Sequence, residues 1–216
     1  MSDIVNFIVS QNVDVDTVYL LLALPFVATL IASFRQVIGI KSFGIYAPLV
    51  LTFALWAAGL KYGLAVFVVV FATGTAVRYF LKTTRLLYMP RMAIVLTVIS
   101  LAILAMLTVG GYYQRYGFSS TSILPILIMI TLIEKFISAQ VEKGLRTASV
   151  LSFETMLIAV AGYFIITWDA FRGFVLEYPY YIFVLLLINL WLGKWTGLRL
   201  SEYLRFKDVI KNVESD

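Results

Sequence analysis

The sequence contains no cysteine and no histidine. These absences exclude disulfide bonds, thiol nucleophiles, haem ligands of the usual kind, and the common zinc and copper sites. There is also no phosphate-binding glycine loop and no serine–histidine–acid set. We therefore predict that the chain is not an enzyme and that it binds no cofactor and no metal.

Charge is scarce as well. Charged residues make up 13% of the 216 residues, whereas hydrophobic residues make up 62%. Since roughly a quarter of the residues in a soluble domain are charged, this composition indicates a lipid-embedded protein. The length suits about six to eight spans of roughly twenty residues each. The net charge of +5 comes from basic residues between apolar runs, without a contiguous basic face, so we expect no nucleic-acid partner.

Seven apolar runs divide the chain. A charge at the bilayer centre costs at least about 2.5 kcal/mol, so stretches without charges mark the spans. The sixth run is the one interrupted by a charge, at Glu154. The runs are 17–34, 42–60, 62–77 with an extension to 81, 92–114, 116–133 with an extension to 139, 147–168, and 178–193. This pattern predicts an all-α polytopic membrane helix bundle with seven transmembrane helices.

The basic residues test the parity of this count. Fourteen of the 17 lysines and arginines fall in alternate connections that include the C-terminal tail, and three fall in the others. Cytoplasmic loops carry the excess of Lys and Arg, so the first group faces the cytoplasm. We predict an extracytoplasmic N-terminal segment at 1–16, a transmembrane domain at 17–194 and a cytoplasmic basic tail at 195–216. The first sixteen residues hold no Lys or Arg, so the positive segment of a cleavable signal peptide is missing and the first span is expected to be retained.

Two prolines lie early in the second and fifth runs, in the similar contexts GIYAPLVLT and TSILPILIMIT. Pro48 and Pro125 each remove a backbone donor and are expected to bend or break their helices. Each is followed by a Gly-Leu-basic triplet, eleven and nineteen residues downstream. The pattern suggests an inverted 3+3 repeat plus one further helix, with interrupted helices meeting near the midplane on a substrate path. Two chance prolines among seven spans are the alternative interpretation.

Ionisable residues inside spans are the other candidates for a substrate path, because they are costly in lipid and usually face the bundle interior. Glu134 and Glu154 are expected toward the cytoplasmic ends of their spans, where Arg78, Lys135 or Arg146 would neutralise them. Glu142 and Arg146 have the i,i+4 spacing of a helical ion pair. Glu134 is either part of a proton or cationic-substrate path or one side of a structural salt bridge.

Four stretches together resemble a bacterial family of seven-helix membrane domains that are usually fused to an inactive transglutaminase-like domain. They are FGIYAPLVLTFALWAAGLKYG from Phe43, LLYMPRMAIVLTVISLAILAM from Leu86, LPILIMITLIEKFISAQVEKGLRTA from Leu124 and LGKWTGLRLSEYLRFKDVI from Leu192. In that family the transglutaminase-like domain precedes the helices and lies outside the cytoplasm, so the resemblance implies a standalone membrane half with an outer partner. A more distant similarity is to the small membrane subunit of poly-gamma-glutamate synthases.

The resemblance implies a non-enzymatic component of a bacterial envelope system in the inner membrane. Such proteins look associated with ATP-grasp ligase-like proteins, so the expected role is to anchor or pass a peptide or amino-acid conjugate made on the cytoplasmic side. The alternatives are an autonomous secondary transporter of a small solute and a purely structural anchor. The sequence predicts neither the substrate nor the oligomeric state.

Overall fold

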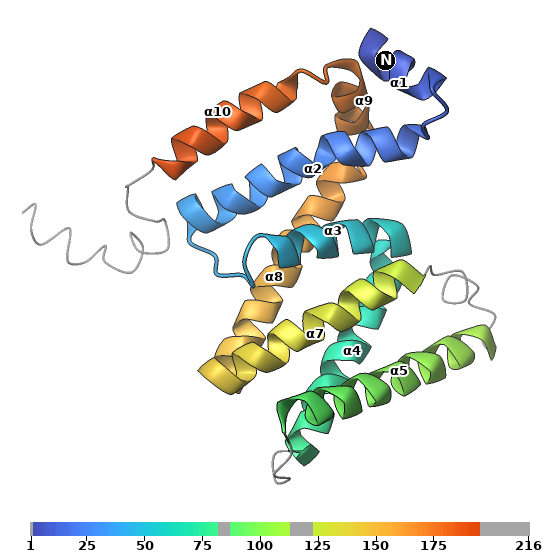
Figure 1. Cartoon of the computed structure of the whole chain (residues 1–216), viewed down its shortest axis with the longest axis vertical. Coiled ribbons are helices and arrows are strands. Elements are labelled where there is room, and N and C mark those ends of the chain that lie inside the picture. Colours follow the sequence, from blue (N-terminus) through green and yellow to red (C-terminus); the bar gives the residue numbers. More distant parts are fainter. Residues whose placement is uncertain (1, 82–86, 113–122, 195–216) are drawn as a thin grey trace, which may run out of the picture. The chain divides into compact units, whose positions relative to one another are not determined.

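The computed structural model of the chain describes residues 2–81, 87–112 and 123–194, and every regular element in these ranges is helical (Figure 1). The predicted cytoplasmic tail at 195–216 lies outside the described residues. The helices are α1 (Asp3–Ser10), α2 (Val15–Ser33), the π-helical turn η1 (Phe34–Ile38), α3 (Tyr46–Ala58), α4 (Leu60–Leu81), α5 (Tyr88–Tyr112), α7 (Ile123–Lys143), α8 (Leu145–Ile166), α9 (Asp169–Glu177) and α10 (Tyr181–Gly193).

The seven apolar runs coincide with α2, α3, α4, α5, α7, α8 and α10. Within the described ranges, five helices are long and apolar enough to cross a membrane: α2 with η1, α4, α5, α7 and α8. A sixth span results if α9 and α10 count as one, and these two are bent by 103°. The sequence thus predicts the all-α membrane architecture correctly, while two of its seven runs form shorter helices than expected.

The two short helices, α3 and α10, have 13 residues each. Such a helix is about 20 Å long, against a hydrocarbon layer of roughly 30 Å. The run 42–60 does not supply a full-length helix because α3 begins only at Tyr46, after a turn at Gly44. The run 178–193 is shortened by the bend that precedes α10. Apolar content alone cannot reveal either turn.

The chain divides into two compact units, 1–49 with 164–216 and 50–163. In the first unit, α2 packs against α10, α9 and α1. Figure 1 shows α10 alongside α2. Buried side chains of α2, among them Tyr19, Ala23, Val27 and Ile31, form the centre of this unit. Pro25 lies inside α2, and the sequence analysis did not single it out.

Side chains of α10 make hydrogen bonds to α2 on both sides of Pro25. The Tyr181 hydroxyl donates to the Leu22 carbonyl at 2.5 Å, and the Asn189 amide donates to Thr29 Oγ1 at 2.6 Å. Thr29 in turn donates to the Pro25 carbonyl at 2.8 Å. A proline is tolerated in a membrane helix where neighbouring side chains supply hydrogen bonds to the disturbed backbone. These contacts join α2 and α10, the first and last of the long apolar runs.

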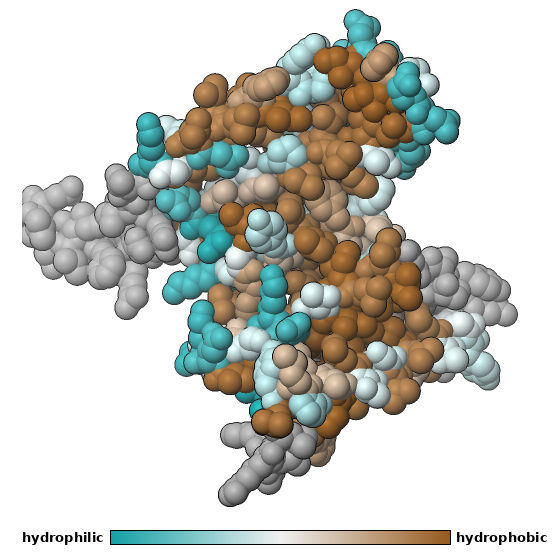
Figure 2. Space-filling model, in the orientation of Figure 1, coloured by the Kyte–Doolittle hydropathy of each residue, from teal (hydrophilic) through white to brown (hydrophobic). Residues whose placement is uncertain are grey.

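In the second unit, α4 packs against α5 and α7, and α5 also contacts α7. Gly74 of α4 makes this packing close, because a Cβ atom placed there would lie 2.7 Å from the side chain of Ile133 in α7. Gly74 thus has the packing role expected of small residues in membrane helices. Figure 2 shows mostly apolar residues over α5 and the right-hand part of α7, as expected for a surface in contact with lipid, and hydrophilic residues over the left-hand part of α7.

Candidate functional site

The helix pairs α3–α4 and α7–α8 are each joined through one glycine with positive φ, Gly59 at +77° and Gly144 at +84°. Only glycine adopts this conformation without a steric cost, so each glycine ends one helix and starts the next. The Gly-Leu-basic triplets seen in the sequence are these two corners. Glu142 and Arg146 consequently belong to different helices, and the described residues show no ion pair between them. Their predicted pairing along one helix is wrong.

The helices that follow the two corners match in detail. Both α4 and α8 have 22 residues. Counted from the corner glycine, positions 4, 7, 11 and 15 are buried in both: Gly63, Val66, Val70 and Gly74 in α4, and Ala148, Leu151, Thr155 and Ala159 in α8. An internal repeat predicts this agreement in length and in buried face. It supports the candidate inverted repeat through its corners and the helices after them.

The two prolines do not mark these corners. Pro48 is the third residue of α3, within the first helical turn. A proline at this place removes a donor that has no partner inside the helix in any case, so the prediction that Pro48 bends or breaks its helix is wrong. Pro125 is the third described residue of α7, which follows the range 113–122 outside the described residues, so its effect on the helix stays a prediction. Since Pro48 and Pro125 belong to different units, the meeting of the two helices near the midplane stays a prediction.

The two matching helices differ in side-chain polarity, because α8 carries polar residues at positions where α4 is apolar. Positions 8, 10 and 11 after the corner are Phe67, Val69 and Val70 in α4, but Ser152, Glu154 and Thr155 in α8. Ser152 and Thr155 are buried and donate to carbonyls of their own helix, those of Ala148 and Leu151. The Thr52 hydroxyl of α3, also buried, donates to the Ala159 carbonyl of α8 at 3.3 Å. Three buried hydroxyls and one half-buried carboxyl thus lie on α8 and the adjoining α3 in the second unit. We call these residues the α8 polar cluster: Thr52, Ser152, Glu154 and Thr155.

Glu154 is the ionisable member of the α8 polar cluster. It is the tenth of the 22 residues of α8, about 14 Å from the start of the helix and so near the middle of a bilayer core of roughly 30 Å. This corrects the expectation that it lies toward one end of the span. Its Oε2 atom is buried and has no hydrogen-bond partner among the described residues, and the side chain makes no ion pair there. A buried acceptor without a partner is costly, and such groups are often retained for function.

Glu134 has the opposite environment. It is the twelfth of the 21 residues of α7, again near the middle of the helix, but it is exposed on the outside of the second unit together with Lys135. Neither residue forms an ion pair within the described ranges. Arg78, which is half-buried, bonds instead to the Ile137 carbonyl of α7 at 3.2 Å. Arg78 is thus bonded to α7. The two glutamates differ in environment, since Glu134 is exposed and Glu154 is half-buried.

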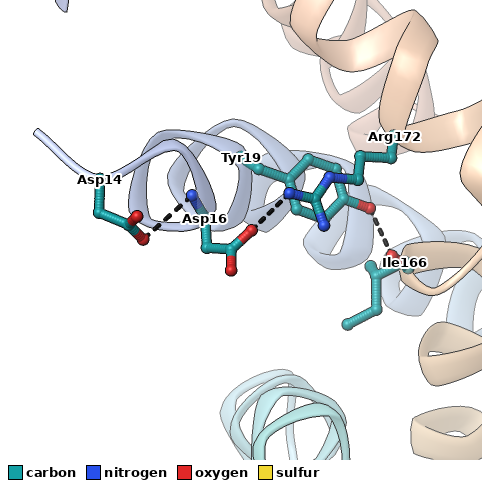
Figure 3. Close-up of polar contacts among 5 residues, drawn as sticks. All are labelled: Asp14, Asp16, Tyr19, Ile166 and Arg172. Carbon is teal, nitrogen blue, oxygen red and sulfur yellow. Dashed lines mark hydrogen bonds and ion pairs between the residues drawn. The ribbon is translucent and has the colours of Figure 1, made fainter. Parts of the chain in front are cut away.

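The first unit carries a second cluster, at the ends of α2 and α9 (Figure 3). Asp16 accepts a hydrogen bond from the Arg172 guanidinium at 2.5 Å, and this guanidinium lies 5.4 Å from the centre of the Tyr19 ring. The Tyr19 hydroxyl donates to the Ile166 carbonyl, and Asp14 caps α2 by accepting from the Asp16 amide. The two charged side chains are 41% and 48% exposed, so the ion pair contributes little free energy and mainly sets the position of α9.

Sequence analysis missed most of these contacts. Ser152 and Thr155 lie three residues apart, at helical spacing, and this signal was present in the sequence. The partnership of Asp16 with Arg172, in contrast, joins residues 156 apart. Within the described ranges, no group of acidic side chains is placed to hold a metal ion. The α8 polar cluster offers a proton acceptor and hydroxyl dipoles inside a membrane helix bundle. These groups suit a proton or a polar solute better than bond-breaking chemistry.

The chain matches the family model described as seven transmembrane helices usually fused to an inactive transglutaminase, over residues 2–210. The match covers all the described helices and extends across both units. The chain matches no curated protein and no solved structure.

Proposed function

This chain belongs to the family of seven transmembrane helices usually fused to an inactive transglutaminase, and on that premise we propose that it is a non-enzymatic membrane component of a bacterial envelope system. Its task is to anchor or pass a peptide or amino-acid conjugate made by an ATP-grasp ligase-like partner on the cytoplasmic side. A transglutaminase-like partner acts on the outer side. The protein resides in the inner membrane, with the N-terminus outside and the C-terminus inside.

The observation that carries this proposal is the family match over 2–210, because the usual fusion joins such helices to a domain described as inactive. A membrane module of a kind usually fused to an inactive transglutaminase favours binding and presentation over catalysis. The sequence has neither a cysteine nor a histidine to serve as nucleophile or general base.

The distribution of charge supports different partners on the two sides. Fourteen of the 17 basic residues fall on one side, and a surface of this sign attracts an acidic enzyme or an anionic peptide. The opposite side carries Asp3, Asp14 and Asp16 on α1 and α2. One of its three basic residues, Arg172, is already engaged by Asp16. The proposed outer face is therefore acidic, whereas the proposed cytoplasmic face is basic.

Purification from the native host under mild detergent tests the proposal. The tagged full chain is expected to recover an ATP-grasp ligase-like protein and a transglutaminase-like protein. The double variant Lys143→Glu/Arg146→Glu reverses two exposed charges on the basic side, so it should lower recovery of the ligase-like protein severalfold and leave the outer partner bound. Quantitative mass spectrometry of the eluates measures both.

Lys61→Glu is the matched control, because it reverses an exposed basic residue on the opposite side. It should leave the ligase-like protein bound. If the wild-type chain recovers neither partner, and a deletion strain has unchanged envelope peptides, the proposal is wrong.

A second candidate function is secondary transport of a small solute. It is favoured by one observation, the buried and unpartnered Oε2 of Glu154 near the middle of α8. The matching helix–glycine–helix corners add to it, because transporters often bind their substrates where two inverted repeats meet. The burial of this atom favours Glu154 over the exposed Glu134 as the residue on such a path.

A further inference from the structure

Two arginines of the second unit converge on one stretch of α7. Arg78, in the last turn of α4, donates to the Ile137 carbonyl at 3.2 Å. Tyr88, the first residue of α5, places its hydroxyl 3.4 Å from that of Ser138. Arg91 lies three residues after Tyr88, on the next turn of α5. Because Ile137 and Ser138 are neighbours, Arg78 and the first turn of α5 contact the same part of α7, and Arg91 is near enough for its charge to act on Arg78.

The charge of Arg78 is not neutralised by the described residues. Arg78 and Arg91 are both half-buried, and Arg78 makes no ion pair with a described residue. Two neighbouring cations that are partly removed from water repel each other more strongly than they would in bulk solvent. An arginine has five donors, and one of them on Arg78 is used by the Ile137 carbonyl. The remaining donors and the charge of Arg78 suit an anion.

Large apolar side chains close to the arginines in the sequence are exposed among the described residues. Tyr79 and Phe80 at the end of α4, and Leu87 and Met89 at the start of α5, have exposed fractions of 76% to 80%. In a chain that crosses the membrane, such side chains lie against lipid. The ligand that fits this surface therefore needs both an anionic group for the guanidiniums and apolar chains for the surrounding residues.

We infer that Arg78 and Arg91 bind the phosphate of an anionic phospholipid, whose acyl chains cover the apolar residues at the ends of α4 and α5. Guanidinium groups bind phosphate oxygens through paired hydrogen bonds, and basic sites between membrane helices hold lipid headgroups. The bound lipid joins α4, α5 and α7 at this end of the second unit. It acts as a structural ligand, independently of any solute or partner handled elsewhere.

Titration of the purified full chain in a neutral detergent with phosphatidylglycerol, followed by thermal unfolding, tests this inference. Phosphatidylglycerol is expected to raise the unfolding temperature of the wild type, whereas phosphatidylcholine is not. Arg91→Gln should weaken apparent binding roughly tenfold, and Arg78→Gln/Arg91→Gln by more, since each substitution removes charge-assisted hydrogen bonds. Arg78→Lys keeps the charge but not the fork of donors, so it should have an intermediate effect.

Arg146→Gln is the control, because it removes an exposed basic residue at the start of α8, outside the cluster. It should retain the wild-type response. The inference is overturned if Arg91→Gln responds to phosphatidylglycerol as the wild type does, or if phosphatidylcholine stabilises the wild type equally. Stabilisation by inorganic phosphate alone, at the same concentration as the lipid, would also overturn it, since the ligand would then be a free anion.

Discussion

Gly74→Leu is expected to destabilise the second unit by about 1–3 kcal/mol or more, because an added side chain overfills a packed interface. Its Cβ alone would lie 2.7 Å from Cγ1 and Cδ1 of Ile133, which is fully buried, and 3.6 Å from Ile99 Cδ1. Neither α5 nor α7 can accommodate the added atoms unless the helix moves away from α4. Thermal unfolding of the purified protein measures the loss.

A compensating change makes this prediction specific. Gly74→Ala should cost less than Gly74→Leu, and Ile133→Val should recover part of that cost by removing the Cδ1 atom that the new Cβ meets. Gly173→Leu is the control, since nothing lies within 4 Å of a Cβ at that position. If the two leucine variants unfold at the same temperature, α4 and α7 are not packed as described.

Glu154→Met is expected to stabilise the purified protein by roughly 1–3 kcal/mol, because it replaces a buried acceptor without a partner by an apolar side chain of similar length. The same change should remove the function of the α8 polar cluster. Residues that cost stability and are retained are typical of functional sites. Thermal unfolding measures the first effect, and uptake of labelled solutes into liposomes that contain the full chain measures the second.

Glu142→Met is the control for stability, because Glu142 is exposed near the end of α7 and has no such penalty. For uptake, Glu154→Gln is compared with Glu134→Gln: loss of uptake in the first alone supports a path through the α8 polar cluster. A lower unfolding temperature for Glu154→Met would mean that the carboxylate stabilises the fold. It would remove the observation on which the transport hypothesis depends.

The membrane class and the order of the helices were predictable from the sequence because both follow from hydrophobicity and charge. The scarcity of charge and the fourteen-to-three division of basic residues require no knowledge of packing. The helix ends were less predictable, since a turn at Gly44 shortens α3 and a 103° bend separates α9 from α10 without a clear change in apolar content.

The candidate site was predictable in composition but not in geometry. Glu134 and Glu154 are both acidic residues in the middle of apolar helices, and only the direction in which each helix turns them distinguishes the exposed one from the half-buried one. The prolines show the reverse problem. Pro48 suggested an interrupted helix, but its place in the first turn of α3 makes it harmless, and the described breaks occur at Gly59 and Gly144.

We propose that a seven-span chain presents its two faces to different partners, and the absence of cysteine makes this topology directly measurable. Single cysteines at the exposed positions Ser10, Gly173, Lys41 and Lys194 are treated with a membrane-impermeant maleimide in spheroplasts, before and after permeabilisation. We expect Ser10→Cys and Gly173→Cys to react in intact spheroplasts, whereas Lys41→Cys and Lys194→Cys react only after permeabilisation. Reaction of Ser10→Cys and Lys194→Cys from the same side would require an even number of spans and would contradict the seven-span topology.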